Sequence, residues 1–385
     1  NMDRIQRELE ERRLPDFMDK EMEESGFSEK RKKQKRILRD VLYGKMPFMD
    51  YETTFRETGK DPDAYGGRAV LYHVLATVSV YGKQVSFPFQ IILPKIAAGK
   101  TGEKGTFLYA GFTPVAGDGV AEVVLERGYG IAHVFYQDMA ADFPDGFQSG
   151  LGRAGVRNPY HSAGKVALWA FGLCRVMDYL EQTGIVDSGR VTVMGHSRLG
   201  KTALAAGAFD DRFSLTAAIQ SGAGGIALFR GKKGEQLSDL YKEHSREWFG
   251  PGVYDYRERV EELPFDQHFL AALTAPRNLL IGSALRDFWA DPLSEYLSCV
   301  AGTEIYRRMG AGGLVRKAET ETVLFQGEAY TKEGGGEREP GEGCTWGIAG
   351  ESLDGEIGWY CRYGTHYLSI LDWEQVIRYR EIHNL

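Results

Sequence analysis

The chain has 385 residues, of which 43% are hydrophobic and 12% aromatic, and its formal net charge at pH 7 is −7. This apolar content is enough to bury a sizeable core, and the mild negative charge argues against a nucleic-acid partner. No apolar run approaches the about 18 residues that a membrane span needs, so we expect no membrane partner. Residues 3–7 lack the apolar core of a signal peptide, and we therefore expect a cytoplasmic protein.

Residues 1–45 are densely charged and helical in pattern, with a break at Leu14-Pro15. We predict that they form a charged helical extension in front of a single domain over residues 46–385. The extension carries an acidic run over residues 21–24 and a basic run over residues 30–36. Because the two runs have opposite signs, we interpret the basic run as a solvated helix face rather than as a binding surface.

An antiparallel pair of strands opens the predicted domain. Strand patterns over residues 70–80 and 85–94 flank the turn Tyr81-Gly82-Lys83. Helix patterns then alternate with apolar strands, and one of these helices is predicted to be capped by Ser162 and to end at Gly184. The later strands are predicted over residues 106–110, 130–135, 190–194, 214–220, 278–283 and 358–361. This alternation predicts an α/β fold, a three-layer sandwich with helices on both faces of a mostly parallel sheet.

A glycine- and glutamate-rich segment over residues 328–357 interrupts the alternation. A long irregular segment in a compact domain is usually functional or disordered. We consider two interpretations of it, a mobile surface loop and an ordered lid over the functional site.

The octapeptide Gly195-His196-Ser197-Arg198-Leu199-Gly200-Lys201-Thr202 fits two unrelated chemistries. As G-x-x-x-x-G-K-T it matches a phosphate-binding P-loop, and around its serine it fits a nucleophile on a strand-to-helix turn. A P-loop also needs an acidic residue at the end of another apolar strand to hold Mg²⁺, and no later strand provides one. A serine hydrolase needs an acid and then a histidine later in the chain, and Asp287 and His366 supply that order. The whole chain therefore favours Ser197 as a nucleophile.

Several motifs resemble one known family. The segment GHSRLGK at residues 195–201 is similar to the G-C-S-R-x-G-K signature of the glucuronoyl esterases, with His196 where that family most often has cysteine. The segments SGAGG (221–225), LPFDQH (263–268) and DFWADP (287–292) extend the likeness, together with the late histidine. The resemblance is closer to bacterial than to fungal members. It implies an α/β-hydrolase fold and a carbohydrate ester as the substrate.

We predict that His366 is the general base that activates Ser197. A serine attacks an ester at neutral pH only with a base in hydrogen-bond reach and an acid that orients the base. His366 lies in a loop after a late strand, where an α/β hydrolase places its histidine. The alternative base is His268.

The acid is ambiguous, because Asp287 and Asp291 both follow the strand over residues 278–283. We prefer Asp287, which is nearer to the strand end, and interpret Asp291 as a turn or helix-capping residue before Pro292. Fungal glucuronoyl esterases carry a glutamate just before the Ser-Gly turn, where this chain has the neutral Gln220. The carboxylate must therefore come from the later loop.

The oxyanion of the reaction needs two preorganised donors. By position, the backbone N–H of Arg198 is one, and Gly111 or Phe112 is predicted to supply the other. The side chain of Arg198 is a further candidate donor, with an ion pair at the helix N-terminus as the alternative. The resemblance also implies that Lys201 contacts the sugar hydroxyls of a uronate and that Trp289 packs on the same sugar.

We expect neither a metal nor a cofactor, because the chain has no H-x-x-x-H, H-E-x-x-H or paired-cysteine pattern. The cysteines are predicted to be free thiols, namely Cys174, Cys299, Cys344 and Cys361.

These residues predict a serine carboxylic ester hydrolase that acts on a small carbohydrate ester through an acyl-enzyme. The resemblance implies a 4-O-methyl-glucuronate ester of a lignin-type alcohol, and an O-acetylated sugar such as acetylxylan is the alternative substrate. Two other classes are a P-loop nucleotide-binding protein and a catalytically inactive sugar-binding relative.

Overall fold

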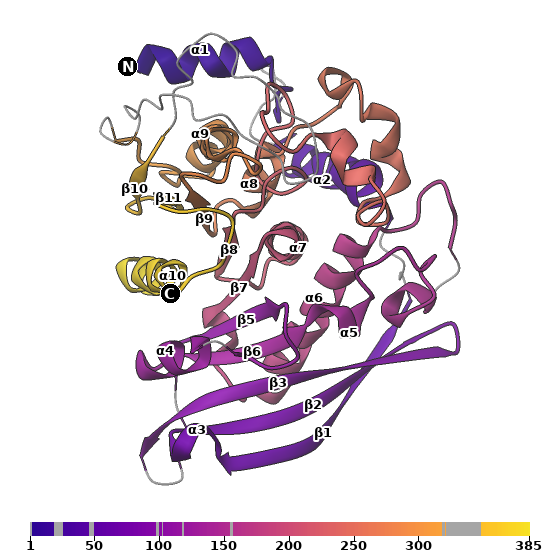
Figure 1. Cartoon of the computed structure of the whole chain (residues 1–385), viewed down its shortest axis with the longest axis vertical. Helices are drawn as coiled ribbons and strands as arrows, with labels where there is room; N and C mark the ends of the chain where they lie inside the picture. The colour runs from indigo at the N-terminus through magenta and orange to yellow at the C-terminus, as the bar shows by residue number, and fades with distance from the viewer. Residues whose placement is uncertain are drawn as a thin grey trace.

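The structure of the protein is a computed structural model that describes residues 2–18, 26–45, 50–97, 100–101, 103–117, 119–154, 157–317, 320 and 348–385. One twisted sheet runs through the middle of the molecule (Figure 1). Its strands follow the order β1-β2-β3-β6-β5-β7-β8-β9-β11-β10, with β4 paired to β3. In chain order they are β1 (Glu52–Asp63), β2 (Ala69–Val80), β3 (Lys83–Ala97), β4 (Lys100–Thr101), β5 (Thr106–Gly111), β6 (Gly130–Phe135), β7 (Val191–His196), β8 (Leu215–Ile219), β9 (Asn278–Ala284), β10 (Gly350–Ser352) and β11 (Ile357–Arg362).

The centre of the sheet is parallel and its margins are antiparallel. The strands β6, β5, β7, β8, β9 and β11 pair in parallel with their neighbours. The strands β1, β2 and β3 at one margin and β10 at the other are antiparallel. The predicted α/β-hydrolase architecture with an antiparallel entry is confirmed.

The burial of their side chains explains which strands could be predicted from the sequence. Every side chain of β5 and β7 is buried, as expected for parallel strands that are covered on both faces. Most side chains of β2 alternate between buried and partly buried, which makes the period of two readable. The edge strand β1 was not predicted, because its side chains are mostly exposed and many are charged.

Helices cover both faces of the sheet (Figure 1). The helices α6, α7, α8 and α9 enclose one core cluster, whereas α4 and α10 enclose the other. In chain order the α-helices and the π-helix η2 are α1 (Met2–Arg12), α2 (Phe27–Leu38), η2 (Arg39–Tyr43), α3 (Ala64–Gly67), α4 (Val120–Glu126), α5 (Tyr136–Met139), α6 (Lys165–Thr183), α7 (Arg198–Phe209), α8 (His268–Thr274), α9 (Pro292–Arg308) and α10 (Ile370–His383). Short 3-10 helices are η3 (Gly150–Arg153), η4 (Ser188–Arg190), η5 (Leu237–Tyr241), η6 (Pro251–Tyr256) and η7 (Val260–Glu262).

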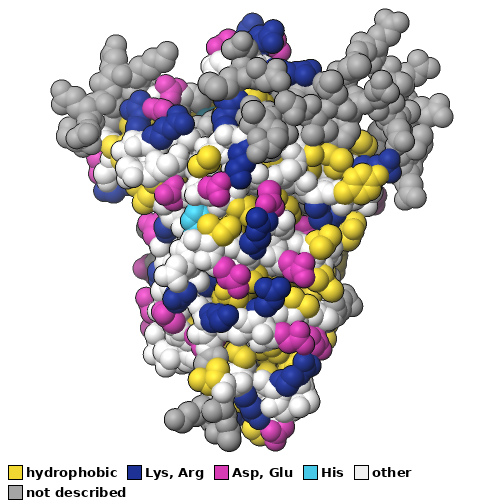
Figure 2. Space-filling model, turned by 90° about the vertical axis from the view of Figure 1, so that its left-hand side faces the viewer, with side chains coloured by type: hydrophobic (Ala, Val, Ile, Leu, Met, Phe, Trp, Pro, Cys, Tyr) yellow, Lys and Arg dark blue, Asp and Glu magenta, His cyan; other side chains and the backbone are white. Residues whose placement is uncertain are grey.

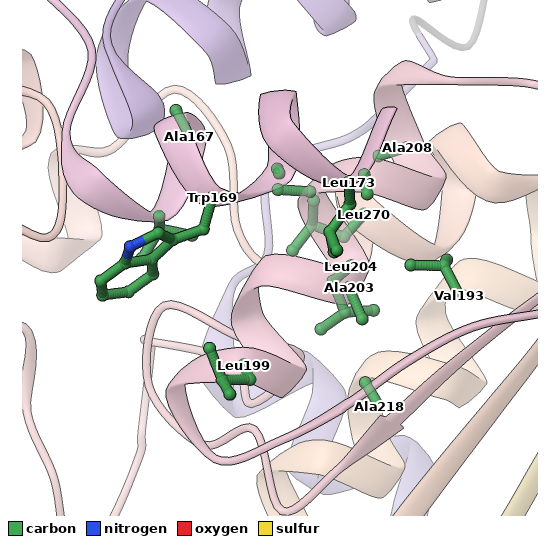
Figure 3. Packing of buried hydrophobic residues seen from close by; sticks show 14 of the residues in the cluster. Ala167, Trp169, Leu173, Val193, Leu199, Ala203, Leu204, Ala208, Ala218 and Leu270 are labelled. Carbon is green, nitrogen blue, oxygen red and sulfur yellow. The ribbon is translucent and has the colours of Figure 1, made fainter. Parts of the chain in front are cut away.

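The helix α7 lies in the interior of the first core cluster (Figure 3). Its own buried side chains include Leu199, Ala203 and Leu204. The cluster around it contains Trp169 and Leu173 of α6, Val193 of β7, Ala218 of β8 and Leu270 of α8. This packing holds the helix that follows Ser197 on all sides, so the turn in front of it sits on a rigid support.

The helix α6 begins two residues later than predicted. Its N-cap is Gly164, whereas the side chain of Ser162 accepts a hydrogen bond from the backbone N–H of Asn158 at 2.7 Å. A Cβ on Gly164 would lie 2.4 Å from the carbonyl oxygen of Trp248, so a residue with a side chain does not fit there. The predicted end is confirmed, because Gly184 has φ 58° and terminates the helix.

The basic run of α2 is not only a solvated face. Lys30 is buried, and Arg31 donates to the carbonyl oxygen of Ala275 at 2.9 Å. Lys35 donates to the carbonyl oxygen of Phe209 at 3.2 Å. The interpretation as a solvated face is therefore wrong for these basic residues, which contact the rest of the protein. The acidic run over residues 21–24 lies outside the described residues.

The glycine- and glutamate-rich segment is described only at its C-terminal end. Residues 328–347 lie outside the described part of the chain, and with them the choice between a loop and a lid. Gly350–Ser352 form β10, which pairs with β11, so the segment is not irregular throughout.

The surface beside α10 carries intermingled acidic and basic side chains with small apolar areas between them (Figure 2). Within the described ranges, no helix combines the length and the apolar character needed to cross a membrane.

Candidate active site

Ser197 lies on a sharp turn between β7 and α7. Its backbone has φ 58° and ψ −127°, a strained conformation that is typical of a nucleophile on a strand-to-helix turn. Two glycines permit this turn. A Cβ on Gly195 would lie 2.0 Å from the carbonyl oxygen of Leu199, and a Cβ on Gly200 would lie 3.1 Å from that of Ile219. The glycine after the serine is displaced by one position because Leu199 is buried in the core, while Gly200 lies against β8.

Ser197, His366 and Asp287 form a continuous chain of hydrogen bonds. Nε2 of His366 lies 2.9 Å from Oγ of Ser197, and Nδ1 of His366 lies 2.7 Å from Oδ2 of Asp287. An ionised carboxylate only accepts hydrogen bonds, so Nδ1 carries the imidazole proton and Nε2 can accept one from the serine. The side chain of Asp287 is 1% exposed and that of His366 is 40% exposed. The acid is thus enclosed, whereas the imidazole is partly open to solvent.

The structure brings Asp287, and not Asp291, to His366. Asp287 follows β9, and one of its oxygens also accepts from the backbone N–H of Ala290 at 3.2 Å. Asp291 instead caps α9, where its side chain accepts from the backbone N–H groups of Ser294 at 3.2 Å and Lys233 at 2.8 Å. The capping interpretation of Asp291 is confirmed.

Gln220 supports the loop that carries His366. Its Nε2 donates to the carbonyl oxygen of Thr365 at 2.9 Å, and its Oε1 accepts from Nε2 of His196 at 2.9 Å. The ring of His196 lies 4.8 Å from the ring of His366. Burial, and then the neighbouring His366, lower the pKa of His196 to about 3, so this ring is neutral. The amide of Gln220 therefore positions the loop that carries His366, and it does not stand in for a triad acid.

The predicted oxyanion donors lie beside the serine turn. Arg198 is the first residue of α7, where backbone N–H groups have no partner within the helix. Gly111 ends β5, and the ring of the next residue, Phe112, lies 6.2 Å from the ring of His196. A Cβ on Gly111 would lie 2.4 Å from Nε2 of His133, so only glycine fits at the end of this strand.

The side chain of Arg198 forms an ion pair with Asp142. The same carboxylate accepts from the hydroxyl of Tyr136 at 2.6 Å and from Nε1 of Trp248 at 2.9 Å. The guanidinium also lies 4.8 Å from the ring of Trp248. The ion pair that we named as the alternative is thus present. The Arg198 side chain remains 30% exposed, and its role as a further donor stays a prediction.

Lys201 is buried in the first turn of α7. Its Nζ donates to the carbonyl oxygen of Ser221 at 2.8 Å and lies 3.4 Å from Oε2 of Glu235. The backbone N–H of Glu235 donates to the carbonyl oxygen of Trp289 at 2.9 Å. Nζ of the buried Lys232 donates to the same carbonyl at 3.0 Å. Lys201 and the backbone of Trp289 are therefore joined through Glu235, next to the loop that bears Asp287.

The family model of fungal glucuronyl esterases matches residues 76–310, which is more than half of the chain. The chain belongs to the glucuronoyl esterase family. The matched segment includes Ser197, Arg198, Lys201, Asp287 and Trp289 but ends before the late histidine.

The matches to curated relatives of this family cover only part of the length of each relative. The chain is 35% identical over 272 residues to carbohydrate esterase MZ0003 of an unknown prokaryotic organism, which covers 70% of this chain and 56% of that protein. It is 40% identical over 161 residues to a 4-O-methyl-glucuronoyl methylesterase of Neurospora crassa, which covers 39% of this chain and 40% of that protein. The chain thus spans about half or less of the length of these relatives.

A solved glucuronoyl-esterase-type structure matches nearly the whole chain. This structure is a promiscuous CE15 esterase from a marine bacterial metagenome, with a TM-score of 0.77 and 27% sequence identity. The match covers 97% of this chain and 98% of that chain. The resemblance that the motifs indicated is confirmed.

Two alternatives from the sequence, a P-loop at residues 195–202 and His268 as the base, do not fit the geometry of this site. The P-loop interpretation is wrong, because the hydroxyl of Ser197 lies at the end of a hydrogen-bonded chain through His366 to Asp287 and the family model of the esterases matches this segment. His268 is buried in α8, and its Nε2 pairs with the carbonyl oxygen of Pro15 at 3.1 Å. It therefore does not act on Ser197.

Three residues of the site were missed from the sequence, namely Asp142, Glu235 and Trp248. Each belongs to a loop or an irregular segment, and no period or motif marks it. The described residues contain no group of three or more histidine, cysteine or acidic side chains that could hold a metal. The described cysteines Cys174, Cys299 and Cys361 are free and buried, and Cys344 lies outside the described residues.

Proposed function

We propose that the chain is a serine carboxylic ester hydrolase that cleaves a carbohydrate ester through an acyl-enzyme. The observation that carries this proposal is the hydrogen-bonded chain from Ser197 through His366 to the enclosed Asp287. A nucleophile, a base and an acid in this order at distances of 2.9 and 2.7 Å have the geometry of acyl transfer.

In the proposed reaction, Oγ of Ser197 attacks the ester carbonyl while Nε2 of His366 takes the serine proton. The negative charge of Asp287 stabilises the imidazolium that forms, and it also keeps the second proton on Nδ1. The backbone N–H of Arg198 and an N–H of Gly111 or Phe112 stabilise the oxyanion.

His366 then returns its proton to the oxygen of the leaving alcohol, and the C–O bond breaks to give an acyl-enzyme. A water molecule, deprotonated by the same imidazole, attacks the acyl carbonyl. Release of the acid restores the hydroxyl of Ser197. Because the side chain of His366 is 40% exposed, we expect both the alcohol and the water to reach the imidazole.

The acid part of the ester is proposed to be a glucuronate. Lys201 and Glu235 can hold vicinal sugar hydroxyls, because an ammonium donates and a carboxylate accepts hydrogen bonds. Trp289 is half-buried and its backbone is hydrogen-bonded to Glu235, and we propose that its ring packs on the C–H groups of a pyranose. The names of the relatives, which include 4-O-methyl-glucuronoyl methylesterase, support this substrate class.

An acetylated sugar is the second candidate. The structural neighbour described as promiscuous supports a site that accepts more than one ester. An acetyl group is smaller than a uronoyl group, so it would reach Ser197 without contacting Lys201 or Trp289.

Paired assays on a methyl glucuronate and on an acetylated xylo-oligosaccharide test the proposal. We expect hydrolysis of the uronate ester with the higher kcat/KM, and a loss of about 10⁶-fold in turnover for Ser197→Ala. Lys201→Met should raise KM for the uronate and leave acetyl hydrolysis unchanged. A Ser197→Ala variant with more than a few per cent of wild-type activity would contradict the serine mechanism. A higher kcat/KM on the acetyl ester would select the second candidate.

A further inference from the structure

We propose that Arg362 is a positioning residue that holds the His366 loop, and that Asp372 holds Arg362. The His366 loop comprises residues 363–367, between β11 and α10. The inference rests on the proposed function, because it assigns a task to a residue that contacts neither Ser197 nor the ester.

The His366 loop is exposed, so burial does not hold it. Tyr363, Thr365, His366 and Tyr367 are all exposed. Fixing the backbone of each such residue costs conformational entropy. The distance of 2.9 Å between His366 and Ser197 therefore depends on polar contacts to the loop backbone.

Arg362 supplies many of these contacts. Its Nη1 donates to the carbonyl oxygen of Tyr363 at 3.3 Å. Its Nη2 donates to the carbonyl oxygens of Thr365, at 3.5 Å, and of Tyr367. The guanidinium also lies 4.2 Å from the ring of Tyr367. One side chain thus binds carbonyls on both sides of His366.

Asp372 fixes the guanidinium from the opposite side. Nε of Arg362 lies 2.9 and 3.0 Å from the two oxygens of Asp372, and the two side chains are 7% and 0% exposed. Asp372 also accepts from the hydroxyl of Tyr360 at 2.9 Å and from the backbone N–H of Ser369 at 2.8 Å. Because Asp372 uses only Nε, both terminal nitrogens of Arg362 remain available for the His366 loop.

The absence of a side chain at Gly364 accommodates this close approach. Its φ is 132°, and a Cβ there would lie 2.5 Å from Nη1 of Arg362. A side chain at position 364 would therefore displace the guanidinium from the carbonyls that it binds. Glycine at position 364 therefore leaves room for Arg362.

Only a guanidinium can make this set of contacts. Arginine carries five N–H donors in a rigid planar fork, whereas lysine carries one compact ammonium group. Arg362→Lys keeps the charge beside Asp372 but cannot span three carbonyls. The charge and the positioning role are therefore separable by this single substitution.

The experiment compares Arg362→Lys with wild type by kcat and KM on methyl glucuronate, by the rate of fluorophosphonate labelling of Ser197, and by thermal unfolding. A misplacement of about 1 Å can cost on the order of 10²-fold in rate, so we expect kcat and labelling to fall roughly 10- to 100-fold. KM should stay within about twofold, since Lys201 and Trp289 are untouched. Asp372→Asn removes the charge that fixes the guanidinium and leaves the sequence of the His366 loop unchanged. It should reproduce the loss, and it decides the question if Arg362→Lys does not fold.

The matched control is Arg378→Lys. Arg378 lies on α10 and pairs with both oxygens of Glu351 at 2.6 and 2.8 Å, away from the His366 loop. We expect wild-type kcat for this variant. Wild-type kcat and labelling in Arg362→Lys would overturn the inference, and so would a loss that matches the fraction of unfolded protein. If wild type labels but hydrolyses neither ester, the proposed substrate is wrong, and the labelling rates alone decide the role of Arg362.

Discussion

Asp287 and Asp291 lie four positions apart and have different partners. Asp287 meets the imidazole of His366, whereas Asp291 caps α9. We predict that Asp287→Asn lowers turnover about 10²- to 10⁴-fold, because a neutral amide cannot stabilise the imidazolium. Asp291→Asn makes the same chemical change and should keep near wild-type turnover, since asparagine also caps helices well. Steady-state kinetics of both variants provide the measurement, and full activity of Asp287→Asn would contradict the assignment.

A second residue, Glu295, is a buried acid that is not in the triad. It lies 2.5 Å from Oγ of Ser283 and accepts from the backbone N–H of Gly222 at 3.0 Å. Burial is the main cause that raises the pKa of Glu295 to about 7, and the nearby Asp287 raises it further. Because the folded pKa lies above the ordinary value of 4.5, the protonated form stabilises the fold. This stability is complete below the ordinary value and is lost as the pH rises through the folded pKa.

We predict that Glu295→Gln removes this dependence, because glutamine resembles the protonated acid. The free energy of unfolding of wild type relative to the variant should fall by up to about 3 kcal/mol between pH 5 and pH 8. Urea titrations of both proteins at the two pH values measure the difference. An identical pH dependence in both proteins would show that the carboxyl group does not titrate in this range.

At the scale of elements, the site is assembled from the ends of parallel strands. Ser197 follows β7, Asp287 follows β9 and His366 follows β11. The carboxyl ends of parallel strands lie at one edge of a sheet, so three loops far apart in sequence meet there. Backbone hydrogen bonds also tie the acid loop to the base loop, since the N–H of Arg286 donates to the carbonyl oxygen of Gly364 at 2.9 Å.

The end of β8 joins this assembly through Gln220. Because its amide donates to the carbonyl oxygen of Thr365, a carboxylate at this position would face that oxygen without a proton to share. We predict that Gln220→Glu lowers kcat by about 10-fold, which corresponds to roughly one lost hydrogen bond. It should not restore activity to Asp287→Asn.

The variant Gln220→Met separates charge from the loss of the donor. Methionine has a similar length but no N–H, so a loss equal to that of Gln220→Glu would assign the whole effect to the missing hydrogen bond. Rescue of Asp287→Asn by Gln220→Glu would instead mean that the side chain at position 220 reaches His366.

At the scale of the whole molecule, three buried histidines make folding sensitive to acid. Burial is the first cause in each case, and it lowers the pKa of His133 to about 4, of His196 to about 3 and of His268 to about 4. Below the ordinary value of 6.5, the unfolded chain binds protons that the folded protein does not. Stability is therefore present above this value and falls as the pH drops, by about 1.4 kcal/mol per pH unit for each histidine. Glu295 offsets one of these three protons above its ordinary pKa.

We predict that His268→Gln makes the dependence on pH shallower by about one proton between pH 6 and pH 5. Glutamine keeps an N–H that can reach the carbonyl oxygen of Pro15 but has no site for an added proton. The slope of the unfolding free energy against pH is the measurement. A slope equal to that of wild type would mean that His268 is protonated in the folded protein.

Local sequence determined the elements around the nucleophile. An apolar run, two glycines and an alanine-rich segment act within a few positions of Ser197, so strand, turn and helix are readable without a structure. The chain order of Ser197, Asp287 and His366 was readable as well, because an α/β hydrolase places them after successive strands. The edge strand β1 could not be predicted from the sequence, because most of its side chains are exposed and apolar residues do not alternate along it.

Only the tertiary structure decided which side chains meet. It selected Asp287 over Asp291, paired Arg198 with Asp142 and Lys201 with Glu235, and brought Arg362 beneath the His366 loop. The physical reason is that helix and strand periods describe how a segment faces the core but not where irregular loops end. Whether a polar contact between two loops forms depends on differences of a few tenths of an ångström in the distance between its atoms. These distances are set by the packing of the whole sheet and its helices.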